Sequence, residues 1–102
     1  MSEKIRFAVV GAGHIGKRHA TMIQQDSESQ LVAMADTNST LEKEITGSFN
    51  VPFFNSIEHF LASGIECDVV NICTPNNLHS PLALTALEAG KHVVLEIGRA
   101  HV

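Results

Sequence analysis

Three glycines at positions 11, 13 and 16, in the spacing Gly-x-Gly-x-x-Gly, constrain the fold of this chain more than any other feature. The apolar run Ile5–Val10 comes directly before them and is typical of a buried strand, and from Ile15 onward the pattern becomes helical. Because a strand that turns sharply into a helix through glycines opens a β-α-β unit, the spacing predicts an α/β fold.

The same alternation of strand and helix continues to the end of the chain. We expect further strands at 31–35, 51–54, 68–73 and 92–96. Ser39–Glu42 has the pattern of a capping box, Ser56 is expected to cap the next helix, and Ser80 to cap a last helix with Pro81 at its first position. Right-handed crossovers then predict a doubly wound parallel sheet of order 3-2-1-4-5, whose ligand lies where the order reverses, between strands 1 and 4.

Each glycine has a separate physical role in a dinucleotide-binding loop. Gly11 allows the tight turn, Gly13 lacks the Cβ that would keep a pyrophosphate away from the backbone, and Gly16 lets the helix pack closely. The N–H groups of the first helical turn, which contains His14 and Ile15, would then face the phosphates. An ordinary glycine turn is the alternative interpretation, but it does not explain the strand and helix on either side.

Asp36 ends the second apolar run, twenty residues after Gly16. A carboxylate there can accept hydrogen bonds from both hydroxyls of an adenosine ribose, whereas a 2′-phosphate would meet like charge. The cofactor is therefore expected to be NAD, with NADP disfavoured. The alternative is that Asp36 only begins a turn, because the segment 36–39 also has turn and cap composition.

Composition narrows the class of protein. The chain has 102 residues and a net charge of −4 without an extended basic cluster, so we expect neither a nucleic-acid nor a membrane partner. No apolar run approaches the length of a membrane span and no signal-peptide pattern is present, so we expect a cytoplasmic protein. Cys67 and Cys73 lack metal-ligand spacing and are expected to be reduced core residues.

The segment after the fourth strand is a second candidate site. Thr74, Pro75, Asn76 and His79 follow a strand that borders the first one, so they are expected to face the glycine loop. A plain turn followed by a helix cap explains the same residues without a ligand. For His79 the residues leave two alternatives open, a proton shuttle or a surface side chain.

Three motifs together resemble a known family. They are Gly-Ala-Gly-His-Ile-Gly at 11–16 with His19, Cys-Thr-Pro-Asn at 73–76 with His79, and Gly-Lys-His-Val-Val-Leu-Glu at 90–96. This combination resembles the N-terminal Rossmann domain of the Gfo/Idh/MocA oxidoreductases, over residues 5–96. For His19 by itself, packing of the helix is an equally good explanation.

The resemblance implies a function and a set of cofactor contacts. The family transfers a hydride between a nicotinamide cofactor and a hydroxyl or ketone of a sugar-like or polyol substrate. By resemblance, the glycine loop binds the pyrophosphate and Asp36 the adenosine ribose, and Glu96 approaches the nicotinamide ribose. The residues implied on the nicotinamide side are Thr74, Pro75, Asn76 and His79.

The resemblance ends after Glu96. The family has a lysine next, in a Glu-Lys-Pro motif that takes part in proton transfer, whereas this chain has Ile97 and Gly98. An isoleucine cannot accept the proton that leaves an alcohol during hydride removal. We therefore assign no catalytic residue and expect the 102-residue chain to be inactive alone. The substrate domain, and with it the homo-oligomer interface, would belong to a full-length protein.

The last residues suggest a reason for this departure. Residues 96–102, Glu-Ile-Gly-Arg-Ala-His-Val, resemble the translation of a widely used sequencing adapter, whose next codon is a stop. The hypothesis is a dinucleotide-binding domain at 1–96 followed by an artefactual tail at 97–102, with Glu96 itself partly encoded by adapter. Codons of the source gene beyond this point would test it.

Two other classes of function remain open. An S-adenosylmethionine-dependent enzyme with a Rossmann fold also carries an acid at the end of its second strand, although its glycine loop usually differs. The other class is a non-catalytic dinucleotide sensor, which an intact gene without a lysine after Glu96 would favour.

Overall fold

The computed structural model describes residues 3–74 and 79–96. Within these residues, five strands alternate with four α-helices and one short 3₁₀ helix. The elements are β1 (Ile5–Val10), α1 (His14–Gln25), β2 (Ser29–Ala35), η1 (Ser39–Leu41), α2 (Glu42–Phe49), β3 (Phe53–Phe54), α3 (Ile57–Ala62), β4 (Val69–Ile72), α4 (His79–Glu88) and β5 (His92–Leu95).

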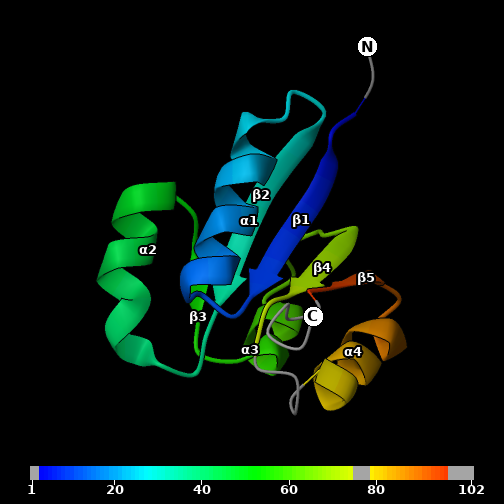
Figure 1. The fold of residues 1–102 in the computed structure, drawn as a ribbon. Helices are drawn as coiled ribbons and strands as arrows, with labels where there is room; N and C mark the ends of the chain where they lie inside the picture. The colour runs from blue at the N-terminus through cyan, green and yellow to red at the C-terminus, as the bar shows by residue number, and fades with distance from the viewer. Residues whose placement is uncertain (1–2, 75–78, 97–102) are drawn as a thin grey trace, which may run out of the picture.

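The strands form one parallel sheet of order β3-β2-β1-β4-β5, which confirms the predicted doubly wound topology. Figure 1 shows α1 and α2 on one side of the sheet and α3 and α4 on the other. The order reverses between β1 and β4, so their carboxyl ends open between the two helical layers.

Alternation along the strands builds a separate core on each side of the sheet. On the α3–α4 side, Val70 and Ile72 of β4 pack with Phe60 of α3. On the α1–α2 side, Val9 of β1 packs with Ile45 of α2. All five side chains in these two groups are at most 1% exposed, as a sheet covered on both faces requires.

The start of α2 differs from the predicted capping box. Asn38, one residue before Ser39, caps the 3₁₀ helix η1: its side-chain oxygen accepts hydrogen bonds from the backbone N–H and the hydroxyl of Thr40, at 3.1 and 2.6 Å. The helix α2 itself follows Leu41 and has no side-chain cap. Ser39 instead begins the 3₁₀ turn η1 that precedes α2. An asparagine at this position closes a turn with the N–H two residues on, and a tight first turn can use that bond as readily as a serine cap.

The start of α4 also differs from the prediction. The helix already includes His79, so Ser80 is a helical residue and not the cap. Pro81 is consequently the third helical residue; it is tolerated because the N–H groups of a first turn have no partner within the helix. Ser56 does cap α3 as predicted, accepting from the backbone N–H of His59 at 3.1 Å.

An ion pair closes the amino end of the sheet. The guanidinium of Arg6 donates to both carboxylate oxygens of Asp68, each at 3.1 Å, and its backbone N–H donates to the same carboxylate at 2.8 Å. This bidentate contact joins the start of β1 to the residue before β4, at the opposite end of the sheet from the glycine loop. We therefore assign this ion pair to stabilising the fold and not to the cofactor site.

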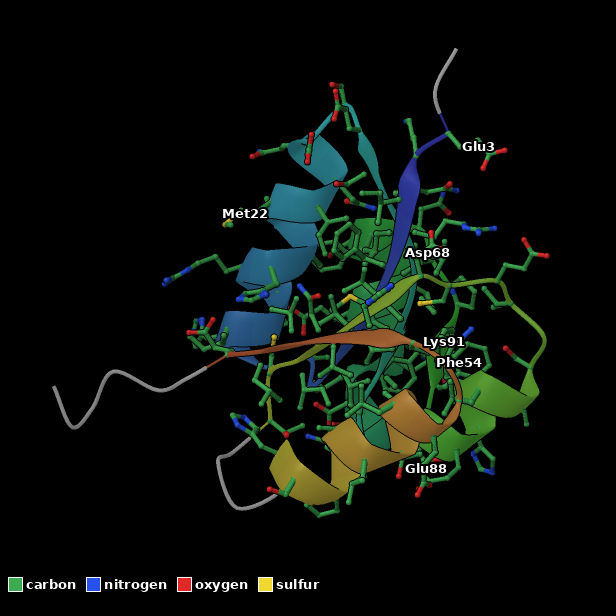
Figure 2. All side chains as sticks on the ribbon, turned by 90° about the vertical axis from the view of Figure 1, so that its right-hand side faces the viewer. Glu3, Met22, Phe54, Asp68, Glu88 and Lys91 are labelled. Carbon is green, nitrogen blue, oxygen red and sulfur yellow. The ribbon has the colours of Figure 1, made fainter. Side chains whose placement is uncertain are left out.

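The β5 edge carries exposed apolar side chains. Leu84 and Leu87 of α4 and Val94 and Leu95 of β5 are each 42–57% exposed. Figure 2 shows the molecule from this edge. The strand β5 crosses the front of the view, with Lys91 near its start, and α4 lies below it with Glu88 labelled. Within residues 3–74 and 79–96, no helix is both long enough and apolar enough to cross a membrane.

Candidate cofactor site

The glycine loop turns so tightly that two of its positions exclude any side chain. Gly11 has φ of +100°, and a Cβ there would lie 2.8 Å from the carbonyl carbon and oxygen of Cys73. A Cβ on Gly16 would lie 1.7 Å from the carbonyl oxygen of Gly11. The first turn of α1 therefore packs closely on the glycine loop, and the loop packs on the end of β4. These are the close contacts that the glycine spacing predicts.

Gly13 differs from the other two glycines because nothing lies within 4 Å of where its Cβ would be. It is the residue before α1, and neither a side-chain cap nor an acidic residue occupies the first turn. Gly13 and His14 are exposed, whereas Ile15 is half-buried. The loop thus presents uncapped N–H groups and the positive end of a helix dipole to the open side, which suits a phosphate.

The carboxylate of Asp36 lies against the glycine loop. One oxygen accepts from the backbone N–H of Ala12 at 2.7 Å, and the other accepts from the backbone N–H of Asn38 at 2.8 Å. Asp36 therefore does begin a turn, as the alternative interpretation stated, and in addition it contacts the loop. The turn and the contact with the loop use different oxygens, so the turn does not compete with a role in ribose binding.

A cleft of about 390 Å³ joins these features. It lies between the carboxyl ends of the central strands and the first turns of α3 and α4. Its walls are formed by Val10, Gly11, Gly13, Ala35, Asp36, Thr37, Ser56, Ile57, Glu58, Cys73, Thr74, Pro81 and Leu82. The lining is mostly apolar and includes the carboxylates of Asp36 and Glu58, which suits an adenosine.

Thr74 supplies an unpaired polar atom at this cleft. Its hydroxyl oxygen is buried and has no hydrogen-bond partner among the described residues. Its methyl carbon would be 3.0 Å from a Cβ on Gly11, so the side chain sits directly beside the loop. A buried hydroxyl without a partner is costly, and a bound ligand would relieve that cost.

The alternative that His79 is a surface side chain is wrong. The residue is only 9% exposed, because its ring Nε2 lies 2.7 Å from the carbonyl oxygen of Thr74. The ring donates to this carbonyl and so connects the start of α4 to the end of β4. Pro75 and Asn76 lie outside the described residues.

Glu96 is linked to two polar side chains on the α1 side of the sheet. The ring Nε2 of His19 lies 2.8 Å from its carboxylate, and the side-chain nitrogen of Asn71 lies 3.1 Å from the ring Nδ1. Sequence reasoning left His19 undecided and did not single out Asn71. The available signal was an asparagine in the middle of an otherwise apolar central strand.

Cys73 lies near the Glu96 carboxylate. Burial, together with the negative charge of Glu96, raises the pKa of its thiol to about 12. Both cysteines of the chain are free. The described residues contain no cluster of three or more His, Cys, Asp or Glu side chains that could bind a metal ion.

The residues present fit an extended dinucleotide. Uncapped N–H groups suit the pyrophosphate, the Asp36 carboxylate suits ribose hydroxyls, and the unpaired hydroxyl of Thr74 lies farther along the same strand ends. Asp36 and Glu96 place one carboxylate after β2 and another after β5, on opposite sides of the loop. Two separated carboxylates match the two riboses of such a cofactor.

Comparisons with known proteins agree with this assignment. The sequence model of the Gfo/Idh/MocA oxidoreductase family, NAD-binding Rossmann fold, matches residues 5–97. Inositol 2-dehydrogenase of Rhizobium meliloti is 34% identical over 94 residues, which cover 90% of this chain and 27% of that protein.

Solved structures show the same similarity. The WlbA dehydrogenase of Bordetella pertussis, in complex with NADH and UDP-GlcNAcA, superposes with a TM-score of 0.85 at 35% identity, over 91% of this chain and 28% of that one. Biliverdin reductase of Synechocystis, in complex with biliverdin and NADP+, gives 0.83 at 35% identity, over 92% and 29%.

The chain spans a little over a quarter of the length of these relatives. The matched part covers all five strands of the sheet and the cleft described above. The protein belongs to the Gfo/Idh/MocA oxidoreductase family, of which this chain is the NAD-binding Rossmann domain.

Proposed function

We propose that this chain binds NAD(H) and is the cofactor-binding domain of an oxidoreductase that acts on a hydroxyl or ketone of a sugar-like or polyol substrate. The observation that supports it most is the Asp36 carboxylate, which contacts the glycine loop and lines the cleft beside it. The relatives named inositol 2-dehydrogenase and D-glucoside 3-dehydrogenase support the substrate class.

The cofactor contacts are proposed from the glycine loop, the carboxylates at the strand ends and the family resemblance. The loop from Gly11 to Gly16, with the N–H groups of His14 and Ile15, receives the pyrophosphate, and Asp36 receives the adenosine ribose. For the nicotinamide side, the family resemblance supports Thr74, Pro75, Asn76 and His79 as contacts. Glu96 receives hydroxyls of the nicotinamide ribose.

The chemistry has two parts, and this chain supplies one of them. A bound nicotinamide accepts or donates the hydride. The chain's own residues orient the two riboses and neutralise the pyrophosphate through backbone dipoles. The alcohol proton needs a separate acceptor, and Ile97 carries none. We therefore propose that the 102-residue chain binds cofactor without turning over substrate.

Further properties of the whole protein are also proposed. A cytoplasmic location agrees with the two free cysteines. Homo-oligomer formation belongs to the full-length protein, and neither nucleic acid nor membrane is a proposed partner, given the net charge of −4.

A titration tests the proposal. Binding of NADH, NADPH and S-adenosylmethionine to the chain is measured by calorimetry under the same conditions. We expect NADH to bind most tightly, NADPH more weakly because its 2′-phosphate meets Asp36, and S-adenosylmethionine not measurably. Preferential binding of S-adenosylmethionine would replace this function with the competing Rossmann class.

The sensor alternative needs a different measurement. The full-length protein is incubated with NAD and with inositol or a simple sugar. Oxidation of the substrate is measured as the formation of NADH. Turnover supports the oxidoreductase, whereas tight NAD binding by a full-length protein without turnover of any polyol or sugar would favour a sensor. Turnover by the 102-residue chain alone would contradict the proposed division of roles.

A further inference from the structure

Three polar side chains from three different elements form a continuous line on the α1 side of the sheet. Asn71 lies in β4, His19 in the second turn of α1, and Glu96 directly after β5. The contacts are 3.1 Å from the Asn71 amide nitrogen to Nδ1 of His19 and 2.8 Å from Nε2 to the Glu96 carboxylate. Residues separated by 52 and 77 positions in the chain are thus brought into one network.

The position of Asn71 is costly for a merely structural residue. It is 6% exposed in a central strand, between Val70 and Ile72, which are fully buried. Its side-chain oxygen is buried without a partner among the described residues. An apolar side chain would fill this position at lower cost, so the amide has to be explained by what it contacts.

The order of donors and acceptors follows from the amide. Because the Asn71 NH₂ group can only donate, Nδ1 of His19 must accept, and the neutral ring then carries its proton on Nε2. That Nε2–H donates to one carboxylate oxygen of Glu96. The amide therefore selects the tautomer, and the ring orients the carboxylate.

The backbone of Glu96 is fixed as well. Its N–H donates to the carbonyl of Ile72 at 3.0 Å, which extends the β4–β5 ladder by one bond. With main chain and one carboxylate oxygen both engaged, the second oxygen has a defined direction. The side chain is 30% exposed, and its second oxygen has no hydrogen-bond partner among the described residues.

We propose that His19 is a positioning residue, which holds the Glu96 carboxylate for the hydroxyls of the nicotinamide-side ribose, and that Asn71 sets the tautomer of His19. The inference rests on the proposed function, because it deepens the role given there to Glu96. A carboxylate already ordered before binding loses less conformational freedom when the ribose arrives.

The test uses three ligands that differ by known parts. ADP reaches only the glycine loop and Asp36, ADP-ribose adds the second ribose, and NADH adds the nicotinamide. Affinities are measured by calorimetry for the 102-residue chain and for His19→Ala, His19→Gln and Asn71→Leu, with circular dichroism to verify folding. His92→Ala is the matched control, because His92 is an exposed histidine on β5.

The expected pattern is selective. In His19→Ala the affinity for ADP stays unchanged, while the gain from ADP to ADP-ribose falls by about tenfold. His19→Gln recovers part of this gain, because its amide can also donate to the carboxylate. Asn71→Leu loses part of it, and His92→Ala changes neither ligand.

A second readout does not depend on any ligand. Nitrogen-15 NMR of the imidazole is expected to show His19 protonated at Nε2 in the free chain, and to show a mixed tautomer in Asn71→Leu. Equal losses for ADP and ADP-ribose in His19→Ala, or an Nδ1-protonated ring, would overturn the positioning role. Failure of the unaltered chain to bind ADP would instead overturn the proposed function, whatever the NMR shows.

Discussion

The carboxylate of Asp36 accepts a hydrogen bond from the backbone N–H of Ala12 at 2.7 Å, across 24 residues of sequence. This contact joins the end of β2 to the middle of the glycine loop. The side chain proposed to bind the ribose is therefore hydrogen-bonded to the loop proposed to bind the pyrophosphate in the structure without cofactor. Substitution at Asp36 should therefore affect binding more than a single lost ligand contact would.

Asp36→Asn is expected to weaken NADH binding by about 10- to 100-fold. The change removes a charged acceptor for the ribose hydroxyls, and hydrogen bonds to charged groups contribute about 1.5–3 kcal/mol each. The preference for NADH over NADPH should shrink at the same time, because the like charge that opposes the 2′-phosphate is gone. Calorimetric titration with both cofactors measures the two effects.

The control for this substitution is Asp26→Asn. Asp26 also accepts from a backbone N–H two residues on and from the hydroxyl of Ser29, but it lies at the far end of α1. We expect a loss of stability and no change in NADH affinity. If both aspartate variants weakened NADH binding equally, Asp36 would have only a structural role.

Alanine substitutions at two glycines of the loop should separate binding from folding. Gly13→Ala meets no atom of the protein within 4 Å, so the chain should fold, with a loss of stability below about 1 kcal/mol. NADH affinity should nevertheless fall by about tenfold or more, because the new methyl group occupies the approach of the pyrophosphate.

Gly16→Ala should show the opposite pattern. Its Cβ would lie 1.7 Å from the carbonyl oxygen of Gly11, so the loop or α1 must shift, at a cost of about 3 kcal/mol or more. Urea unfolding of the two variants measures the difference. Equal stability of Gly13→Ala and Gly16→Ala would contradict the tight packing described for the loop.

The Arg6–Asp68 pair should make stability depend on pH in the acid range. The hydrogen bonds from Arg6 lower the pKa of Asp68 below its ordinary value of 3.8. A carboxylate whose pKa is lower in the folded state stabilises the fold above about pH 4, and the contribution is lost as the pH falls through the lowered value. In Asp68→Asn the free energy of unfolding should fall less steeply between pH 5 and about pH 2 than in the unaltered chain. An unchanged slope would show that the pair contributes nothing.

The thiol of Cys73 should be unreactive in the folded chain. With its pKa raised from 9.0 to about 12 by burial and by the charge of Glu96, the thiol is almost entirely protonated at pH 8. Iodoacetamide labelling followed by mass spectrometry should modify Cys73 rapidly only after unfolding in urea. In Glu96→Gln the reaction should become faster, because a neighbouring negative charge is removed; a slower reaction would contradict the contact.

Lysine substitutions at two adjacent valines of β5 should have different effects on stability. Val94 is 42% exposed at a sheet edge, so Val94→Lys should leave stability unchanged and reduce aggregation, measured by light scattering. Val93 packs against the core on the α3–α4 side, so Val93→Lys should cost about 2 kcal/mol in urea unfolding. Equal destabilisation by the two variants would contradict the exposure of Val94 and indicate that its side chain is packed against other atoms.

Much of the fold was accessible to sequence reasoning because its signals are local. The strand Ile5–Val10 was predicted with the observed bounds, and the sheet order followed from the alternation of strands and helices together with right-handed crossovers. Errors occurred at helix starts, at Ser39 and Ser80, where several polar residues can close the same first turn. Which of these residues caps the helix depends on small differences in the path of the backbone before it.

The Rossmann domain, the glycine loop and the acid at the end of β2 follow from the sequence alone, since each depends on spacing along one strand–loop–helix segment. The contacts between elements become visible only once the elements are packed together. Examples are the burial of His79 against Thr74 and the line from Asn71 through His19 to Glu96. These contacts depend on how α1, β4 and β5 pack together, and periodicity along a chain carries no information about such distances.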